Sequence, residues 1–323
     1  MKINKRDNEF SALLNRDRME QVPPGIDEKL WNGFREKYNN ASLLYENESP
    51  AQLDIELNSN CNMACSFCIH SIEENRNTGI EYEKYTKIID EAISLNIRSL
   101  KLNYMNEPLL VRDLEKFIDY ALKAGMVNVF MSSNGLLLTE RRAKSLIESG
   151  ITKLFVSLDA TTADVYLKLR NNSKFDQIVK NILKFLEIRN EMGLEYPLLR
   201  VNFLKTNTNA HQEQDFIDFW ENKADIVIIQ EMNELIDQKT DLFIEKEVKE
   251  FHCSFPFKQL VVNADGHILP CCTMHGIKLK LGNIATMTLE EAWNSKKAKY
   301  LRQLHNDGKY MENKVCRYCI TGK

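Results

Sequence analysis

The sequence predicts an α/β fold, a partial (β/α)6 barrel of the TIM type followed by a small C-terminal domain. Short runs rich in β-branched and aromatic residues alternate with helical patterns up to about residue 235, and the alternation then stops. The six runs are LDIEL (53–57), SLKLN (99–103), VNVFM (127–131), KLFVS (153–157), LRVNFL (199–204) and DIVII (225–229). Strands that alternate with helices form βαβ units and hence a parallel sheet covered by helices. In such barrels the functional residues follow the carboxyl ends of the strands.

Two of the three predicted parts of the chain come first in sequence. Residues 1–50 are expected to be a helical extension, because Pro23-Pro24-Gly25 precedes an apolar-periodic stretch from Ile26 to Phe34. Residues 51–235 are expected to be the barrel, whose helices are indicated by apolar residues at helical spacing. These residues are Tyr82, Tyr85, Ile89 and Ala92, then Leu114, Phe117, Ile118 and Ala121, then Ile178, Ile182, Phe185 and Leu186.

Residues 236–323 are the third part, the small C-terminal domain. A charged loop opens it, and KQLVVNADGHILP then predicts a β-hairpin with Asp265-Gly266 at the turn. A helix is predicted from about Leu289 to Leu304.

Composition and charge exclude several function classes. The 43 Lys and Arg against 46 Asp and Glu give a net charge of −3, which offers no electrostatic basis for binding nucleic acid or an anionic membrane. No apolar run approaches the roughly eighteen residues of a membrane span, and the start has no signal-peptide segment. We therefore expect a cytoplasmic protein. The glycine patterns of dinucleotide and P-loop sites are also absent.

The cysteines fall into two groups. In a reducing compartment, metal binding or catalysis explains such groups better than disulfides do. The groups are Cys61, Cys65 and Cys68 after the first strand, and Cys253, Cys271, Cys272, Cys316 and Cys319 near the end.

The first group forms a C-x3-C-x2-C motif. A structural zinc site would need a fourth ligand, which His70 could supply. An iron–sulfur cube held by three cysteines instead leaves one iron open for a cofactor or a substrate. This loop resembles the signature of the radical S-adenosylmethionine (SAM) enzymes, and the aromatic Phe67 before the last cysteine also fits.

Segments after the next three strands extend this resemblance over about residues 51–230. Met105-Asn106-Glu107-Pro108 stands where the family has a Gly-Gly-Glu-Pro motif that meets the amino group of SAM, with both glycines replaced. Ser132-Ser133-Asn134-Gly135 resembles the family's Thr-Asn-Gly turn, and Ser157-Leu158-Asp159 its Ser-Leu-Asp segment. The resemblance implies SAM contacts from Phe67, Asn106, Glu107, Ser133, Ser157 and Arg170.

Each of these later segments also has an ordinary structural explanation. The serine segment is a common turn, Asp159 could cap the next helix, and Arg170 could lie on the surface. The resemblance implies that a [4Fe–4S] cluster binds SAM and cleaves it reductively to a 5′-deoxyadenosyl radical, which abstracts a substrate hydrogen. It also implies an external electron donor, flavodoxin or ferredoxin.

The second cysteine group resembles the auxiliary-cluster domain of SPASM and twitch radical SAM proteins. Cys253, Cys271, Cys316 and Cys319 would fully ligate a second [4Fe–4S] cluster, with a zinc ribbon as the alternative. Cys272 is left over. It could return a hydrogen atom to a substrate radical, or it could be a small buried residue.

A fully ligated auxiliary cluster suits electron transfer, and hence the oxidation of a substrate radical. The resemblance to radical SAM dehydrogenases with a single twitch cluster implies that the substrate is a hydroxyl-bearing small molecule such as an aminocyclitol or a sugar. The first alternative is a radical SAM epimerase or peptide-modifying enzyme with Cys272 as the hydrogen donor. The short N-terminal extension, without a strand pattern, weighs against the peptide branch. The second alternative is a non-catalytic metal-binding protein.

Overall fold

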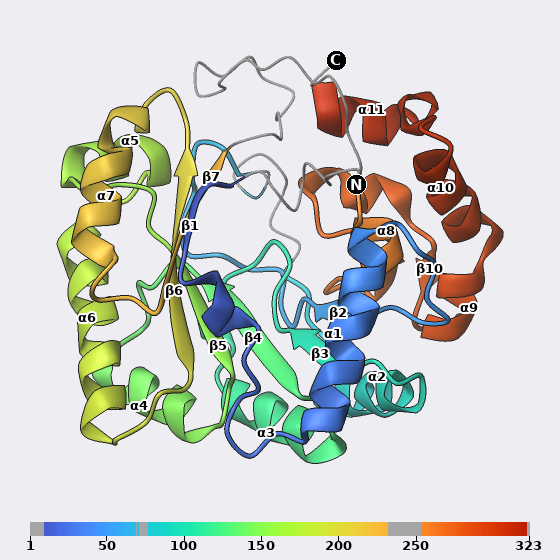
Figure 1. The fold of residues 1–323 in the computed structure, drawn as a ribbon, viewed down its shortest axis with the longest axis horizontal. Helices are drawn as coiled ribbons and strands as arrows, with labels where there is room; N and C mark the ends of the chain where they lie inside the picture. Colours follow the sequence, from blue (N-terminus) through green and yellow to red (C-terminus); the bar gives the residue numbers. More distant parts are fainter. Residues whose placement is uncertain (1–9, 69, 71–76, 232–252, 322–323) are drawn as a thin grey trace.

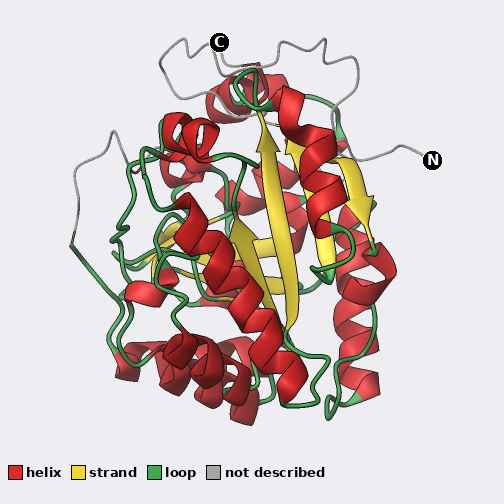
Figure 2. Ribbon diagram, turned by 90° about the vertical axis from the view of Figure 1, so that its left-hand side faces the viewer, coloured by secondary structure: helices red, strands yellow, loops and turns green. Residues whose placement is uncertain are grey.

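The computed structural model describes residues 10–68, 70, 77–231 and 253–321. Over these residues the chain has the predicted mixed α/β fold with a parallel sheet at its centre. The strands form one continuous sheet in the order β1-β7-β6-β5-β4-β3-β2-β8-β9-β10. Figure 1 shows α4–α7 along one side of the sheet and the C-terminal helices on the other side, and Figure 2 shows the long central strands behind the helical layer.

All six predicted barrel strands are present, as parallel neighbours in chain order. They are β2 (Gln52–Ile55), β3 (Ser99–Lys101), β4 (Asn128–Ser133), β5 (Lys153–Ser157), β6 (Leu198–Lys205) and β7 (Ile226–Glu231). The helices that follow them are α2 (Tyr82–Ser94), α3 (Leu114–Ala124), α4 (Glu140–Glu148), α5 (Ala163–Arg170), α6 (Phe175–Glu191) and α7 (Glu213–Trp220). Short 3-10 turns η3 (Pro108–Leu110) and η4 (Ala210–Gln212) lie between them.

The two faces of the sheet differ in chemistry. One face packs against the helices and is apolar, as Leu53 and Ile55 of β2 show together with Tyr85 and Ile89 of α2. Each such fully buried side chain stabilises the fold by roughly 1.5–3 kcal/mol. Because strand side chains alternate, the intervening residues point to the opposite, concave face. That face is polar on β2, where Asp54 lies between the two apolar residues.

The N-terminal extension contains the predicted helix and also an unpredicted strand. After η1 (Arg16–Met19), α1 (Glu28–Ser42) begins at Asp27, whose carboxylate accepts a hydrogen bond from Leu30 N at 2.9 Å. Trp31 and Phe34 pack against Val127 at the amino end of β4. The strand β1 (Phe10–Leu14) pairs antiparallel with β7, so the extension is not wholly helical. Its sequence has no alternation, and the open edge of β7 supplies the pairing.

The predicted C-terminal hairpin is confirmed. After α8 (Phe255–Lys258), β8 (Gln259–Val262) and β9 (His267–Leu269) pair antiparallel around Gly266, whose φ of 79° favours glycine. β8 also pairs parallel with β2, and β10 (Gly282–Asn283) extends the sheet from β9. The sheet is thus continuous across the predicted 236–323 domain, and the three domain boundaries stay predictions. The predicted charged loop lies outside the described residues.

The helix predicted from Leu289 to Leu304 is two helices. Ser295 ends α9 (Leu289–Asn294) in an extended conformation with ψ 150°, and its hydroxyl accepts a hydrogen bond from Ala298 N at the start of α10 (Lys296–Asn306). An N-cap serine thus separates the two helices without a proline or a glycine. The remaining elements are η5 (Met274–Leu279), η6 (Tyr310–Glu312) and α11 (Lys314–Thr321). Within the described part of the chain, no helix is long and apolar enough to cross a membrane.

Candidate active site and cysteine clusters

The first cysteine group lies on the loop that leaves the carboxyl end of β2. Cys65 is buried, and Cys61 and Cys68 are partly buried. Burial raises the pKa of the Cys61 thiol to about 11 and also raises the pKa of Cys68. Thiols in such surroundings lose their protons when a metal centre binds them.

Three other strand ends are hydrogen-bonded to this loop. Glu107 N donates to Asn60 O at 2.9 Å, and Asn134 Nδ2 donates to Asn62 Oδ1 at 2.7 Å. Ser66 donates to the Leu169 carbonyl from its backbone N at 2.9 Å and from Oγ at 3.0 Å. The structure therefore brings together the segments after β2, β3, β4 and β5, as expected for the carboxyl ends of neighbouring parallel strands.

Glu107 is the centre of a hydrogen-bonded group. Its Oε1 accepts from Ser133 Oγ at 2.8 Å and from Leu109 N at 3.0 Å, and its Oε2 accepts from Asn134 N at 2.8 Å. Burial raises the pKa of Glu107, and these hydrogen bonds oppose the rise. The serine segment is therefore more than a turn, because Ser133 and Asn134 orient a buried carboxylate.

The replaced glycines are not needed for the turn before Glu107. Neither Met105 nor Asn106 has a positive φ. Met105 N donates to Glu56 Oε1 at 3.2 Å, and Asn106 Oδ1 accepts from Tyr104 N at 3.1 Å. Asn106 Nδ2 is buried and has no hydrogen-bond partner, so it could donate to a bound ligand.

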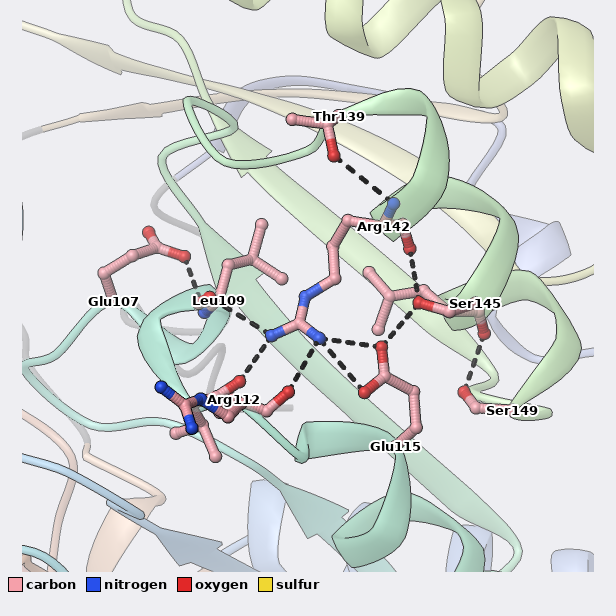
Figure 3. A network of polar contacts seen from close by, with 10 residues as sticks. Glu107, Leu109, Arg112, Glu115, Thr139, Arg142, Ser145 and Ser149 are labelled. Carbon is pink, nitrogen blue, oxygen red and sulfur yellow. Dashed lines mark hydrogen bonds and ion pairs between the residues drawn. The ribbon is translucent and has the colours of Figure 1, made fainter.

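A second network holds the Glu107 segment from outside (Figure 3). The guanidinium of Arg142, on α4, donates to the carbonyls of Leu109 and Arg112, each at 3.2 Å, and also to the Val111 carbonyl. It also binds both carboxylate oxygens of Glu115 at 2.9 and 3.0 Å. One side chain thus fixes the chain from η3 to the start of α3.

Arg170 lies beside the cysteine loop and is not a surface residue. It is 8% exposed, forms an ion pair with Asp159, and places Nη1 3.5 Å from Cys65 Sγ. Its guanidinium carbon lies 5.1 Å from the centre of the Phe67 ring. Burial opposes the charge, but Asp159 and Cys65 together raise the pKa of Arg170 above its ordinary value. Asp159 does not cap α5, because Thr162 is its N-cap residue.

Ser157 is set apart from these groups. It ends β5 on the concave face, where it pairs in register with Asn202 of β6. Asn202 Oδ1 is buried and has no hydrogen-bond partner. Among the described residues no hydrogen bond joins Ser157 to Glu107 or Arg170.

Four cysteines of the second group line one hollow between α8, η5, α10 and α11. The hollow is lined by the four predicted ligands, by His305 and Thr273, and by apolar side chains; its lining is Cys253, Cys271, Cys316, Cys319, Thr273, His305, Pro256, Leu279, Leu301, Val315 and Ile320. His305 Nε2 lies 3.6 Å from Cys316 Sγ. A Cβ at Gly276 would lie 2.5 Å from the Cys271 carbonyl oxygen, so only glycine fits beside this cysteine. The spacing of the motif alone does not reveal that requirement.

Cys272 points elsewhere. It does not line the hollow, and it packs against Tyr104, Val261 and Leu269 on the concave side of β8 and β9. Burial raises the pKa of the Cys272 thiol.

The two cysteine groups differ in the number of thiols that they offer. No three His, Cys, Asp or Glu residues of the described ranges surround a common metal-ion position. His70 Nε2 lies 2.9 Å from the Ser59 carbonyl oxygen, which leaves Nδ1 as the nitrogen that a zinc ion could use. Four thiols around an apolar hollow match a fully ligated [4Fe–4S] cluster, and three thiols on one loop beside Arg170 match a cluster with an open iron.

A groove on the outer helical layer has a volume of about 940 Å³ and is larger than the cysteine-lined hollow. It lies against α4, α6 and α7, with Phe175 and Trp220 in its lining. None of the predicted site residues lines it.

Comparisons with known proteins agree with both cysteine groups. The family model of the Radical SAM superfamily matches residues 55–202, and that of the SPASM iron-sulfur cluster-binding domain matches residues 253–320. The S-adenosyl-L-methionine-dependent 2-deoxy-scyllo-inosamine dehydrogenase of Niallia circulans is 22% identical over 83% of this chain and 92% of its own length. A probable GTP 3′,8-cyclase of Methanococcus maripaludis is 29% identical, but over only 49% of this chain and 51% of the cyclase.

Two solved structures share the fold. BtrN in complex with AdoMet and 2-DOIA aligns with a TM-score of 0.55 and 20% identity, over 82% of this chain and 91% of BtrN. Streptococcus suis SuiB bound to S-adenosylmethionine aligns with a TM-score of 0.62 and 16% identity, over 85% of this chain and 71% of SuiB.

Proposed function

We propose that this chain, which belongs to the radical SAM superfamily and carries a C-terminal SPASM domain, dehydrogenates a hydroxyl-bearing small molecule such as an aminocyclitol or a sugar. The observation that carries the proposal is the hollow lined by four cysteines, next to which Cys272 faces the concave side of the sheet. A fully ligated cluster there can accept an electron but cannot bind the substrate. The Niallia circulans dehydrogenase, which matches over most of both chains, supports the aminocyclitol class.

The front residues hold the cofactors in this proposal. Cys61, Cys65 and Cys68 ligate one [4Fe–4S] cluster, which with SAM supplies one-electron hydrogen-abstraction chemistry when both are bound. Arg170 donates a hydrogen bond from Nη1 to Cys65 Sγ at 3.5 Å. The ion pair with Asp159 holds Arg170 in this position.

Glu107 and its neighbours orient SAM. The buried carboxylate faces a ligand amino group, and Ser133 and Asn134 fix its direction. Asn106 contributes its unpartnered amide, and Phe67 lies beside Arg170. A SAM contact from Ser157 remains a prediction. Glu107 is 1% exposed. Its interaction with the ligand amino group is therefore made away from water, where electrostatic attraction is stronger.

The back cysteines hold the second cluster. Cys253, Cys271, Cys316 and Cys319 ligate it, and the apolar lining keeps water from it. Flavodoxin or ferredoxin as the electron donor and a cytoplasmic location remain predictions.

A radical SAM epimerase or peptide-modifying enzyme is the second candidate. The position of Cys272 favours it, because this thiol lies outside the ligand hollow and is only partly buried. It could therefore give a hydrogen atom to a substrate. A non-catalytic metal-binding protein is the third candidate. The two replaced glycines before Glu107 would favour it, but the turn at Met105-Asn106 needs no glycine.

Metal counting on anaerobically reconstituted protein tests the cluster assignments. We expect about eight irons and eight sulfides in the wild type, and about four of each in Cys65→Ala and in Cys271→Ala. Cys272→Ala is the matched control, and it should keep about eight. Zinc without sulfide would contradict the proposal.

Product analysis then separates the two reactions. With 2-deoxy-scyllo-inosamine as the probe, dehydrogenation forms one ketone, lighter by two hydrogens, for each 5′-deoxyadenosine. Epimerisation leaves the mass unchanged and adds one deuterium in deuterated water. The second result would reject the dehydrogenase.

A further inference from the structure

The concave face of the sheet holds a buried carboxylate with an unused oxygen. Asp54 of β2 is 0% exposed. Its Oδ1 accepts a hydrogen bond from Gln52 Nε2 at 2.6 Å, but its Oδ2 has no partner. Nor does Asp54 form an ion pair with any described residue. A buried polar atom without a partner costs free energy, so such an atom marks a place where a ligand can bind.

Every other buried carboxylate in the described ranges is satisfied. Glu56 accepts from two backbone nitrogens, Met105 N at 3.2 Å and Ala264 N at 2.9 Å. Glu107 accepts the three hydrogen bonds given above. Asp159 and Asp225 each pair with an arginine. Asp54 alone keeps an oxygen available.

Asp54 lies at the junction between the barrel and the auxiliary hollow. Its register partner on β8 is Val261, against which Cys272 packs, and its register partner on β3 is the half-buried Lys101. Gln259, also on β8, is 1% exposed, and its Nε2 has no acceptor. An unused acceptor and an unused donor therefore lie on neighbouring strands near Cys272, the residue that follows the proposed cluster ligand Cys271.

We propose that Asp54 contacts the substrate and accepts its hydroxyl proton during oxidation, an inference that rests on the proposed dehydrogenase function. After hydrogen abstraction the substrate carbon is a radical that bears the hydroxyl. The O–H bond breaks and its proton goes to Asp54 Oδ2. The C=O bond forms, and one electron leaves for the oxidised auxiliary [4Fe–4S] cluster. Gln259 Nε2 donates to the oxygen of a neighbouring hydroxyl of the ring.

The charges around Asp54 suit this role. Burial raises the pKa of Asp54 to about 6, against the opposing effects of Lys101, Gln52 and Lys258. The other titratable group that faces it is the Cys272 thiol, whose own pKa is raised by burial. Asp54 is thus ionised at neutral pH and still binds a proton more readily than an exposed carboxylate does.

Single-turnover assays on the reconstituted protein test this inference. The probe is 2-deoxy-scyllo-inosamine carrying deuterium at the oxidised carbon. In Asp54→Asn we expect deuterium still to enter 5′-deoxyadenosine, while ketone per 5′-deoxyadenosine falls at least tenfold. The ratio of ketone to 5′-deoxyadenosine should rise in the wild type as the pH passes about 6, and it should not rise in the variant. Asp54→Glu should recover part of the ketone, and Asp119→Asn, the same change at an exposed site, should match the wild type.

Infrared difference spectra give a readout independent of turnover. A protonated-carboxyl band that titrates near pH 6 should be present in the wild type, shift when the probe binds, and be missing in Asp54→Asn. A band that does not change on probe binding would overturn the role of Asp54 but not the proposed function. So would a ratio of ketone to 5′-deoxyadenosine in Asp54→Asn within twofold of the wild-type ratio. If the wild type itself forms no ketone from the probe, the proposed function fails, and the role of Asp54 fails with it.

Discussion

Burial of Asp54 makes the stability of the fold depend on pH. The pKa of Asp54 rises from 3.8 to about 6 on folding. The contribution of Asp54 to the free energy of unfolding is therefore fully present below about pH 4 and is lost as the pH rises through 6. Asp54→Asn removes this dependence. We expect the variant to be more stable than the wild type by about 3 kcal/mol at pH 8 and by about half of that at pH 5.

Denaturant unfolding of the reconstituted wild type and variant at pH 5, 6, 7 and 8 measures this difference. A variant less stable than the wild type at pH 8 would mean that the Asp54 carboxylate is paired in the folded protein.

Arg170 combines a structural and a functional role, and substitutions can separate the two. Arg170→Met leaves Asp159 buried without its partner, so we expect a loss of about 3–5 kcal/mol of folding stability. Adding Asp159→Asn removes the unpaired charge, and asparagine tolerates the positive φ of 62° at this position. The double variant should therefore regain most of the stability.

SAM binding should not return in the Arg170→Met, Asp159→Asn double variant. Equilibrium dialysis should show SAM affinity at least tenfold below wild type in both the single and the double variant. Recovery of SAM affinity together with stability would assign Arg170 a structural role only.

At the scale of elements, the loop after β3 depends on a neighbouring helix. Arg142 of α4 binds three carbonyls of the segment that carries Glu107 (Figure 3). In Arg142→Gln the segment loses these contacts, so we expect SAM affinity to fall about tenfold while the iron content stays unchanged. Calorimetric titration with SAM measures the affinity, and Arg141→Gln, its exposed neighbour on the same helix, is the matched control. Equal SAM affinity in the two variants would exclude a positioning role for Arg142.

Elements marked by strong periodicity could be predicted, and those set by tertiary pairing could not. The six barrel strands and the hairpin at Gly266 are present where the sequence places them. The strand β1 was missed because only the open edge of β7 makes it a strand. Likewise, the break at Ser295 depends on a side-chain cap within an otherwise helical pattern.

The candidate site shows the same division. The motifs predicted which segments meet at the cysteine loop, because parallel strand ends share one edge of the sheet. The purely structural explanations considered for Asp159, a helix cap, and for Arg170, a surface position, proved wrong. Thr162 caps α5, and Arg170 is buried. Asp54 was missed because, in LDIEL, it is only a polar residue in an alternating strand. Its significance depends on pairing with β8, some two hundred residues later in the chain.

At the scale of the whole molecule, the shared sheet links the auxiliary hollow to the barrel. β8, which leads to Cys271, pairs with β2, which leads to the first cysteine group. The backbone hydrogen bonds between these strands belong to the barrel and to the C-terminal region at once. A metal cluster bound only by the folded state adds its binding free energy to folding. The two regions should therefore gain stability together when the auxiliary cluster binds.

The double variant Cys316→Ala, Cys319→Ala tests this coupling, because both cysteines lie in α11, away from β2 and β8. We expect scanning calorimetry to show one unfolding transition in the wild type and one in the variant, lower by about 5 °C or more. Far-ultraviolet circular dichroism, dominated by the barrel helices, should report the same midpoint as iron release does in the wild type. Separate transitions, with the barrel midpoint unchanged in the variant, would show that the region from residue 236 onward unfolds as an independent domain despite the continuous sheet.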